Sequence, residues 1–249
     1  MVPSIRTAYN SNFTHAKYET FLQDLYSKHS GALDFRIAET PIFVDKAFKE
    51  KILSACESIV DVITGYNFKT LTSHAIPADV RVPNENDFSH FIAFDFGICE
   101  NEKGELEPQL IEMQGFPTLF AYEVYIDIVT RRHFEIPNNY SAYLSNLNED
   151  SYINLLRDII VANHQPENVI LLEIFPHQQK TRIEFYCTQD YLNIPVICLT
   201  ELIKEGKKLY YEKDGKKIEV KRIYNRIIFD DLQQQTPEKK KKGKLLIED

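Results

Sequence analysis

The sequence predicts an α/β fold: a mixed sheet with flanking helices, followed by a Rossmann-like βαβ unit. The strongest observation is an apolar strand-like run at 169–175, a helical pattern at 177–192 and a short apolar strand at 194–199. Strand, helix and strand in about 30 residues indicate a βαβ unit with a parallel sheet. Two further strand-like runs, at 89–98 and 107–113, flank an acidic turn. The 249 residues, 43% of them hydrophobic and 27% charged, suit a globular protein with one large domain or two small ones.

In the first half of the chain, apolar residues at helical spacing predict a helix over 15–30. A longer apolar stripe predicts a second helix over 45–64, closed by Gly65. Residues 34–44 look extended, and we expect them to join the runs at 89–98 and 107–113 in the mixed sheet. Residues 66–88 are expected to be mostly loop.

In the second half, the pattern predicts helices at about 119–132 and 150–163. Asp214-Gly215, between two alternating runs, predicts a β-hairpin. The polar composition of residues 230–244 predicts a flexible loop or tail. The predicted domains are an α/β region (1–164), a Rossmann-like unit (165–229), and a charged loop or tail (230–249).

The charge and the cysteines narrow the class of protein. A net charge of -8 argues against general nucleic-acid binding, and the run Lys239–Lys242 is interpreted as a solvated surface. The cysteines are scattered and are expected to be buried free thiols; they are Cys56, Cys99, Cys187 and Cys198. There is no signal-peptide pattern and no long apolar run, so we expect a cytoplasmic protein with no membrane partner.

The most informative stretch of the chain runs from Phe94 to Glu123. Asp95 lies in the first strand-like run, and the second run carries Glu112 and Gln114 two residues apart. Side chains alternate across a strand, so Glu112 and Gln114 face the same way, and pairing through the turn at Lys103-Gly104 could bring Asp95 to that face. Three oxygen-bearing side chains suit Mg²⁺. The alternative is that the acids are ordinary surface residues of an edge strand.

The block from Phe94 to Glu123 resembles a segment of glutathionylspermidine synthase-like, circularly permuted ATP-grasp proteins. In that family an R-F-D-F strand is followed by a strand and turn reading L-L-E-Y-N-A-D-T-P-T-S-L. The resemblance implies that Asp95, Glu112 and Gln114 bind Mg²⁺ at the phosphates of ATP. It also implies that the turn carrying Thr118 contacts the acceptor substrate. DGKKIEVKRIYNR resembles the family's hairpin and following strand beside the substrate cleft, which makes Arg226 a second candidate for substrate contact.

The chain departs from the family pattern in three ways. Ala93 stands where the family has an arginine, and Gln114 replaces an asparagine. The family's lysine-bearing ATP-clamping lobe follows the Y-x-R strand, whereas this sequence ends at Asp249. The resemblance implies that the region 1–164 carries the Mg/substrate motif, that the unit 165–229 is pre-ATP-grasp-like, and that the tail 230–249 begins a missing lobe. We therefore expect a ligase-like protein that is incomplete or inactive in this form, that binds ATP weakly without that lobe, and whose catalytic residues are unassigned.

The resemblance implies an ATP-dependent carboxylate–amine ligase, which activates a carboxylate as an acyl phosphate and passes it to an amine. Its partners would be a small-molecule carboxylate and an amine; their identities and the oligomeric state stay open. The alternative is a non-catalytic α/β binding or scaffold protein that retains a pre-ATP-grasp shape. Ala93 favours this alternative, and the retained acids count against it.

Overall fold

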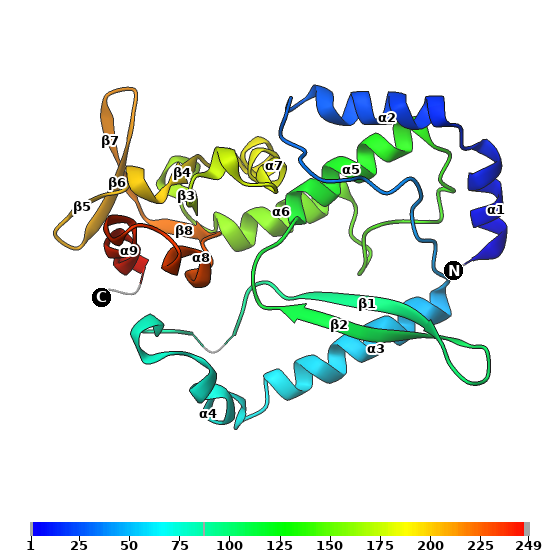
Figure 1. The fold of residues 1–249 in the computed structure, drawn as a ribbon, viewed down its shortest axis with the longest axis horizontal. Helices are drawn as coiled ribbons and strands as arrows, with labels where there is room; N and C mark the ends of the chain where they lie inside the picture. The colour runs from blue at the N-terminus through cyan, green and yellow to red at the C-terminus, as the bar shows by residue number, and fades with distance from the viewer. Residues whose placement is uncertain (1, 87, 247–249) are drawn as a thin grey trace. The chain divides into compact units, whose positions relative to one another are not determined.

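The protein is described by a computed structural model that covers residues 2–86 and 88–246. The chain divides into two compact units (Figure 1). Unit 1 comprises Met1–Arg6, Ile42–Pro117 and Leu246–Asp249, and unit 2 comprises Thr7–Pro41 and Thr118–Leu245. The three domain ranges expected from the sequence stay a prediction.

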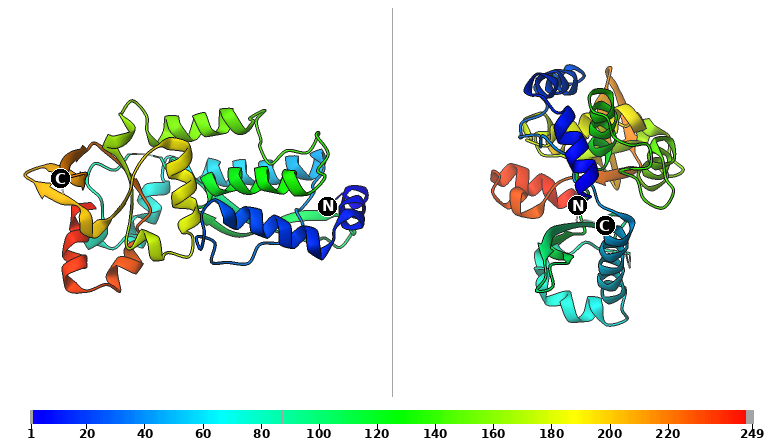
Figure 2. Two further views of the ribbon diagram at one scale, coloured as in Figure 1. Left: turned by 90° about the horizontal axis from the view of Figure 1, so that it is seen from above. Right: turned by 90° about the vertical axis from the view of Figure 1, so that its right-hand side faces the viewer.

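Unit 1 is built from a hairpin and a long helix. Strands β1 (Ala93–Glu100) and β2 (Leu106–Gln114) form a two-stranded antiparallel sheet. Helix α3 (Lys46–Ile63) runs along this hairpin (Figures 1 and 2), and Lys51 Nζ donates to the carbonyl of Leu106 at 3.1 Å. The Asp45 side chain caps α3 by accepting from the amide of Phe48. The predicted helix over 45–64 and the two predicted strands are confirmed.

The expectation that residues 34–44 form a strand is wrong. These residues adopt no strand, and the sheet of unit 1 has two strands within the described residues. Their carbonyls accept hydrogen bonds from tyrosine hydroxyls: Tyr18 donates to Ile37 at 2.5 Å and Tyr9 donates to Glu39 at 3.0 Å. The expected loop at 66–88 also contains a short helix, α4 (Phe68–Thr72), and the 3₁₀ turns η1 (Ser73–Ala75) and η2 (Ala78–Val80).

Unit 2 is centred on a parallel sheet with the strand order β4-β3-β8. The strands are β3 (Val169–Glu173), β4 (Val196–Cys198) and β8 (Arg222–Asn225), and every residue of β3 is buried. Helix α7 (Arg182–Leu192) connects β3 to β4, so the predicted βαβ unit is confirmed. The helix begins later than expected, because a 3₁₀ turn, η4 (Pro176–Gln178), precedes it.

Further helices belong wholly or partly to unit 2. They are α1 (Pro3–Asn12), which spans the first unit boundary, α2 (His15–Ser27), α5 (Phe120–His133) and α6 (Glu149–Ile160). The helices predicted over 15–30, 119–132 and 150–163 are therefore confirmed. A short 3₁₀ turn, η3 (Pro166–Asn168), leads into β3.

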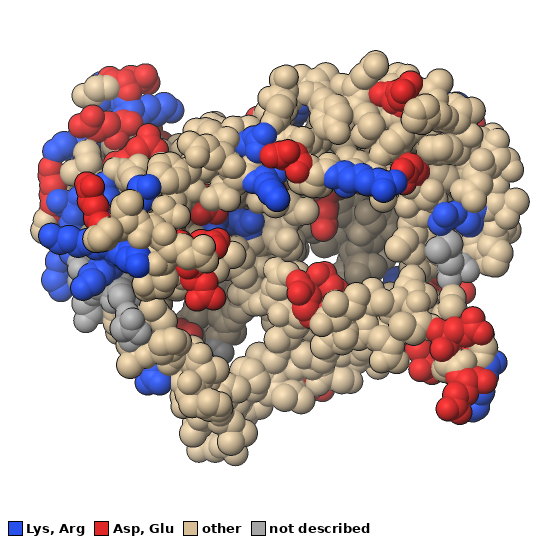
Figure 3. Space-filling view, viewed as in Figure 1, with Lys and Arg blue, Asp and Glu red and all other residues tan. Residues whose placement is uncertain are grey.

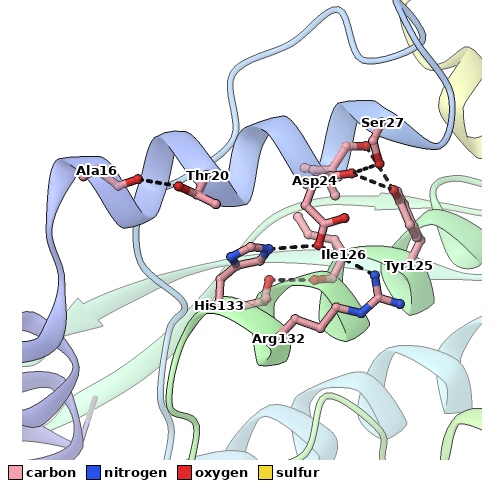
Figure 4. Close-up of polar contacts among 10 residues, drawn as sticks. Ala16, Thr20, Asp24, Ser27, Tyr125, Ile126, Arg132 and His133 are labelled. Atoms are coloured by element: carbon pink, nitrogen blue, oxygen red, sulfur yellow. Dashed lines mark hydrogen bonds and ion pairs between the residues drawn. The ribbon is translucent and has the colours of Figure 1, made fainter.

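Helices α2 and α5 are joined by polar contacts (Figure 4). His133 Nε2 lies 2.9 Å from Asp24 Oδ2, and Arg132 Nη1 lies 3.6 Å from the same oxygen. The Tyr125 hydroxyl donates to the carbonyl of Leu25 at 3.1 Å. The basic residues that end α5 thus hold the last turns of α2.

A separate antiparallel sheet follows β4. Its strands are β5 (Ile203–Glu205), β6 (Lys208–Lys213) and β7 (Lys216–Val220), and the 3₁₀ turn η5 (Leu199–Glu201) precedes it. Asp214 and Gly215 have φ values of 50° and 72°, which a two-residue type I′ hairpin turn requires. The predicted hairpin is confirmed.

The expectation of a flexible loop or tail at 230–244 is wrong. The structure contains α8 (Phe229–Gln233), α9 (Pro237–Gly243) and the 3₁₀ turn η6 (Lys244–Leu246) there. Proline is favoured in the first turn of a helix, lysine is a good helix former, and Leu232 supplies a buried anchor. Residues 247–249 of the predicted tail lie outside the described part of the chain.

The four cysteines differ in how far they are exposed. Cys187 and Cys198 are buried free thiols, as expected, whereas Cys56 is half-buried and Cys99 is exposed.

Across residues 2–86 and 88–246, no helix combines the length and the apolar character needed to span a bilayer.

A buried carboxylate on α7 joins this helix to the start of α5. Glu184 is 0% exposed, and it accepts hydrogen bonds from the amides of Tyr122 at 2.7 Å and Ala121 at 3.0 Å. The Thr188 hydroxyl donates to its other oxygen at 3.1 Å. The amides belong to the first turn of α5, whose N–H groups have no partner within the helix. Glu184, on α7, therefore provides hydrogen-bond acceptors for amides at the N-terminus of α5.

Burial raises the pKa of Glu184 from its ordinary value of 4.5 to about 7, while the two backbone amides and the charge of Arg226 act in the opposite direction. Between these two pH values the folded protein keeps a proton on Glu184 that the unfolded chain has released. The contribution of this residue to stability is therefore greatest at low pH and falls as the pH rises from 4.5 to about 7.

We expect Glu184→Gln to weaken this pH dependence. Glutamine keeps the size and one acceptor oxygen but does not ionise, so the drop in unfolding free energy between about pH 5 and about pH 8 should shrink by roughly 1–3 kcal/mol. Urea denaturation across that range measures the effect. Glu167→Gln, the same change at an exposed position of unit 2, is the control and should leave the profile unchanged. If the unfolding free energy of the Glu184 variant depends on pH as in the native protein, ionisation of Glu184 does not cause this pH dependence.

Candidate functional site

The register of the β1–β2 hairpin brings the three predicted ligands to one face. Asp95 is paired directly with Glu112, and Ala93 is paired with Gln114. The strands are joined by a turn in which the amide of Gly104 donates to the carbonyl of Asn101 at 2.9 Å, so the predicted pairing through Lys103-Gly104 is confirmed. Residues directly opposite each other in an antiparallel pair project to the same side.

A β-bulge adjoins the acidic pair. The register shifts between Asp95 and Phe96, so that Phe96 pairs with Leu110 and Ile111 is the additional residue. A Cβ atom placed on Gly97 would lie 3.8 Å from Ile111 Cδ1, so the isoleucine side chain reaches across the position where β1 has no side chain. Ile111 is 71% exposed. The bulge thus presents an apolar side chain beside the acids, which is a common use of bulges near functional sites.

The two acids have few partners of their own. Asp95 and Glu112 are both exposed, and Gln114 Nε2 donates to Glu112 Oε1 at 2.5 Å. In the described part of the chain, Asp95 makes no side-chain hydrogen bond, and neither acid forms an ion pair with a lysine or arginine. Like charges directly opposite each other in a sheet are destabilising. Within residues 2–86 and 88–246, no lysine or arginine side chain offsets this repulsion.

The donor set fits a hard cation such as Mg²⁺. Two carboxylates on one exposed face supply the oxygen ligands that Mg²⁺ prefers, and exposure leaves room for the waters that it usually retains. No group of three or more His, Cys, Asp and Glu residues is placed to bind a metal anywhere in residues 2–86 and 88–246. A third protein ligand would have to be the amide oxygen of Gln114, whose nitrogen now faces Glu112. The metal role of the three residues stays a prediction.

The two predicted substrate contacts belong to unit 2. The boundary between the units falls between Pro117 and Thr118, so Thr118 and Gln114 lie in different units. Thr118 is half-buried and precedes α5, in which the amide of Glu123 donates to the carbonyl of Leu119 at 2.9 Å. The substrate roles of Thr118 and Arg226 stay predictions.

Arg226 directly follows β8 and is 7% exposed. Its guanidinium carbon lies 5.6 Å from the centre of the Phe185 ring, within the range of a cation–π contact. Its positive charge lowers the pKa of two buried acids, Glu173 and Glu184, and so partly offsets their burial. Arg226 therefore has a structural role in balancing charge inside unit 2, whatever ligand it contacts.

Sequence reasoning missed the buried acids of unit 2. Glu173 ends β3 and is 8% exposed; its Oε1 accepts from the amide of Ile174 at 2.7 Å, and burial raises its pKa to about 7. A signal was present, because Glu173 interrupts the continuous apolar run VILLEIF. Glu184 likewise stands between the apolar residues Ile183 and Phe185 on a helix. An acid in such a context indicates a specific buried partner.

No family model and no curated protein matches the chain. Among solved structures, the chain is similar to a glutathione synthetase-like effector from Globodera pallida in its apo form, with a TM-score of 0.52 and 10% sequence identity. The match covers 88% of this chain and 59% of that protein. At this identity the likeness concerns the fold. The chain is thus an α/β protein that shares the fold of that effector over most of its own length, and it spans 59% of the effector's length.

Proposed function

We propose that the chain is an ATP-grasp-type carboxylate–amine ligase-like protein related to the glutathionylspermidine synthase-like family. The sequence block around Asp95 and Glu112 supports the proposal, as does the glutathione synthetase-like fold. The observation that carries it is the cross-strand pair of Asp95 and Glu112, two exposed acids opposite each other without a balancing side chain in the described residues.

In this proposal Asp95 and Glu112 hold Mg²⁺, and Gln114 adds its amide oxygen after the amide turns. The bound ion would bridge and neutralise the phosphates of ATP. Thr118 and Arg226 would contact the carboxylate or the amine substrate. Ala93, paired with Gln114, adds no positive charge to this face of the hairpin. Without a cation there, we expect weaker phosphate binding than an arginine would give.

We predict that Asp95→Asn stabilises the metal-free protein. Removing one of two opposed charges should raise the unfolding free energy by roughly 0.5 kcal/mol. Urea denaturation in the presence of EDTA measures this change. Glu102→Gln, at an exposed position in the hairpin turn, removes the same charge without a directly opposed acid and should have little effect. A loss of stability in the Asp95 variant would show that the carboxylate has a structural partner.

We predict that Mg²⁺ raises the melting temperature of the native protein and that this rise is lost in Asp95→Asn and Glu112→Gln. An ion that binds only the folded state stabilises it in proportion to the logarithm of its concentration. Thermal denaturation over a series of MgCl₂ concentrations measures the effect, and the Glu102→Gln variant should respond like the native protein. An equal response in all variants would place the ion elsewhere.

The ligase function itself is tested by measuring ADP release from ATP and Mg²⁺ with a panel of small carboxylic acids and amines. Release that depends on both an acid and an amine, and that disappears in Glu112→Gln, would support the ligase. Mg²⁺ binding without ADP release or ATP binding would favour the alternative of a binding or scaffold protein. That alternative draws support from Ala93, which leaves the acidic face of the hairpin without an adjacent positive charge.

A further inference from the structure

The carboxyl ends of the three parallel strands of unit 2 meet at one edge of the sheet. Strand β3 ends in Glu173 and leads to Phe175, β4 ends in Cys198 and enters η5, and β8 leads to Arg226. The central strand β3 is followed by a crossover to β4 on one side, while β8 lies on its other side. In open α/β sheets, the carboxyl edge at such a change of direction is the usual place for a ligand.

The segment formed by α8 and α9 (residues 229–243) lies against this carboxyl edge (Figure 1). Lys239 Nζ is 4.1 Å from the centre of the Phe175 ring, and Lys242 Nζ donates to the carbonyl of Thr200 in η5. The negative charge of Asp231, in α8, contributes to the raised pKa of Glu173. The segment therefore contacts the regions that follow β3 and β4, and it begins just after β8.

The α8–α9 segment depends on tertiary contacts for its structure. Its two helices have five and seven residues, too short to be stable without tertiary contacts. Leu232 is its buried apolar anchor, and a Cβ on Gly243 would lie 2.2 Å from Leu232 Cδ2, so glycine is needed for this close approach. Four consecutive lysines repel one another along α9. Lysine and arginine side chains gather in this region of unit 2 (Figure 3).

The four lysines divide into two pairs. Lys239 and Lys242, three residues apart and hence on one side of the helix, make the contacts with Phe175 and Thr200. Lys240 and Lys241 make no side-chain hydrogen bond or ion pair within the described residues. Cys198 lies between the two docking points: its Sγ accepts from the amide of Phe175 at 3.3 Å and from the Thr200 hydroxyl at 3.1 Å.

We propose that the α8–α9 segment is a detachable strap that closes the carboxyl edge of the parallel sheet. In the closed form, Lys239 and Lys242 hold the strap over Phe175 and Thr200. Release of the strap uncovers Cys198 and Glu173 and opens the edge to small molecules. The strap thereby controls access to the end of the sheet that carries Arg226. This opening does not depend on the proposed ligase function, and it is measured without ATP, Mg²⁺ or a substrate.

The test uses Cys198 as a reporter. Cys198 is 7% exposed, and the fully buried Cys187 of α7 serves as an internal reference in the same unit. The rate at which N-ethylmaleimide labels each cysteine is followed by peptide mass spectrometry in the native protein and in two matched double variants. Lys239→Ala/Lys242→Ala removes the docking contacts, whereas Lys240→Ala/Lys241→Ala removes the same charge from the same helix.

We expect Lys239→Ala/Lys242→Ala to accelerate the labelling of Cys198 by about tenfold, the effect of losing two modest contacts. Lys240→Ala/Lys241→Ala should leave the rate near that of the native protein, and Cys187 should not respond in either variant. Gly243→Ala, which pushes α9 off Leu232 without a change in charge, should also accelerate Cys198. Equal Cys198 rates in all variants, or acceleration of Cys187 together with Cys198, would overturn the strap.

Discussion

The register of the β1–β2 hairpin decides which side chains unit 1 presents on its exposed face. Asp95 and Glu112 are paired directly, and a slip of one residue would turn one of them to the other face. The turn at Gly104 and the bulge at Ile111 belong to the same register. The proposed Mg²⁺ site is therefore a property of backbone pairing. Its unbalanced charge is a local cost to stability that a bound cation would remove.

Unit 2 handles its buried charges differently. Glu184 is satisfied by the amides of Ala121 and Tyr122 at the start of α5, and Arg226 supplies positive charge near both Glu184 and Glu173. Burial makes the charged form of an acid unfavourable and raises its pKa, unless hydrogen bonds or opposite charges offset that cost. Here those partners join α7 to α5 and place charged groups beside the carboxyl edge of the parallel sheet. The α8–α9 segment contacts Phe175 and Thr200, which follow β3 and β4 at that edge.

Local patterns predicted much of the fold. The helix over 45–64, the βαβ unit and the hairpin at Asp214-Gly215 follow from apolar periodicity and turn chemistry, which depend on neighbouring residues. Residues 34–44 could not be predicted in this way, because their carbonyls are engaged by the hydroxyls of Tyr9 and Tyr18 from distant helices. The polar composition of residues 230–244 predicted a flexible loop or tail. The helices found there pack through a single buried leucine, Leu232, which such a composition does not reveal. For the candidate site, the sequence indicated the pairing of Asp95 with Glu112 but not the hydrogen bond from Gln114 that occupies Glu112.

The most direct test of the cation site is NMR spectroscopy with Mn²⁺ as a paramagnetic substitute for Mg²⁺. Substoichiometric Mn²⁺ should selectively broaden the amide signals of residues 93–97 and 110–114, because they surround the paired acids. The broadening should be reversed by excess Mg²⁺ and should be absent in Asp95→Asn/Glu112→Gln. If the hairpin signals are unaffected, or if they broaden equally in that double variant, Asp95 and Glu112 do not form the metal site.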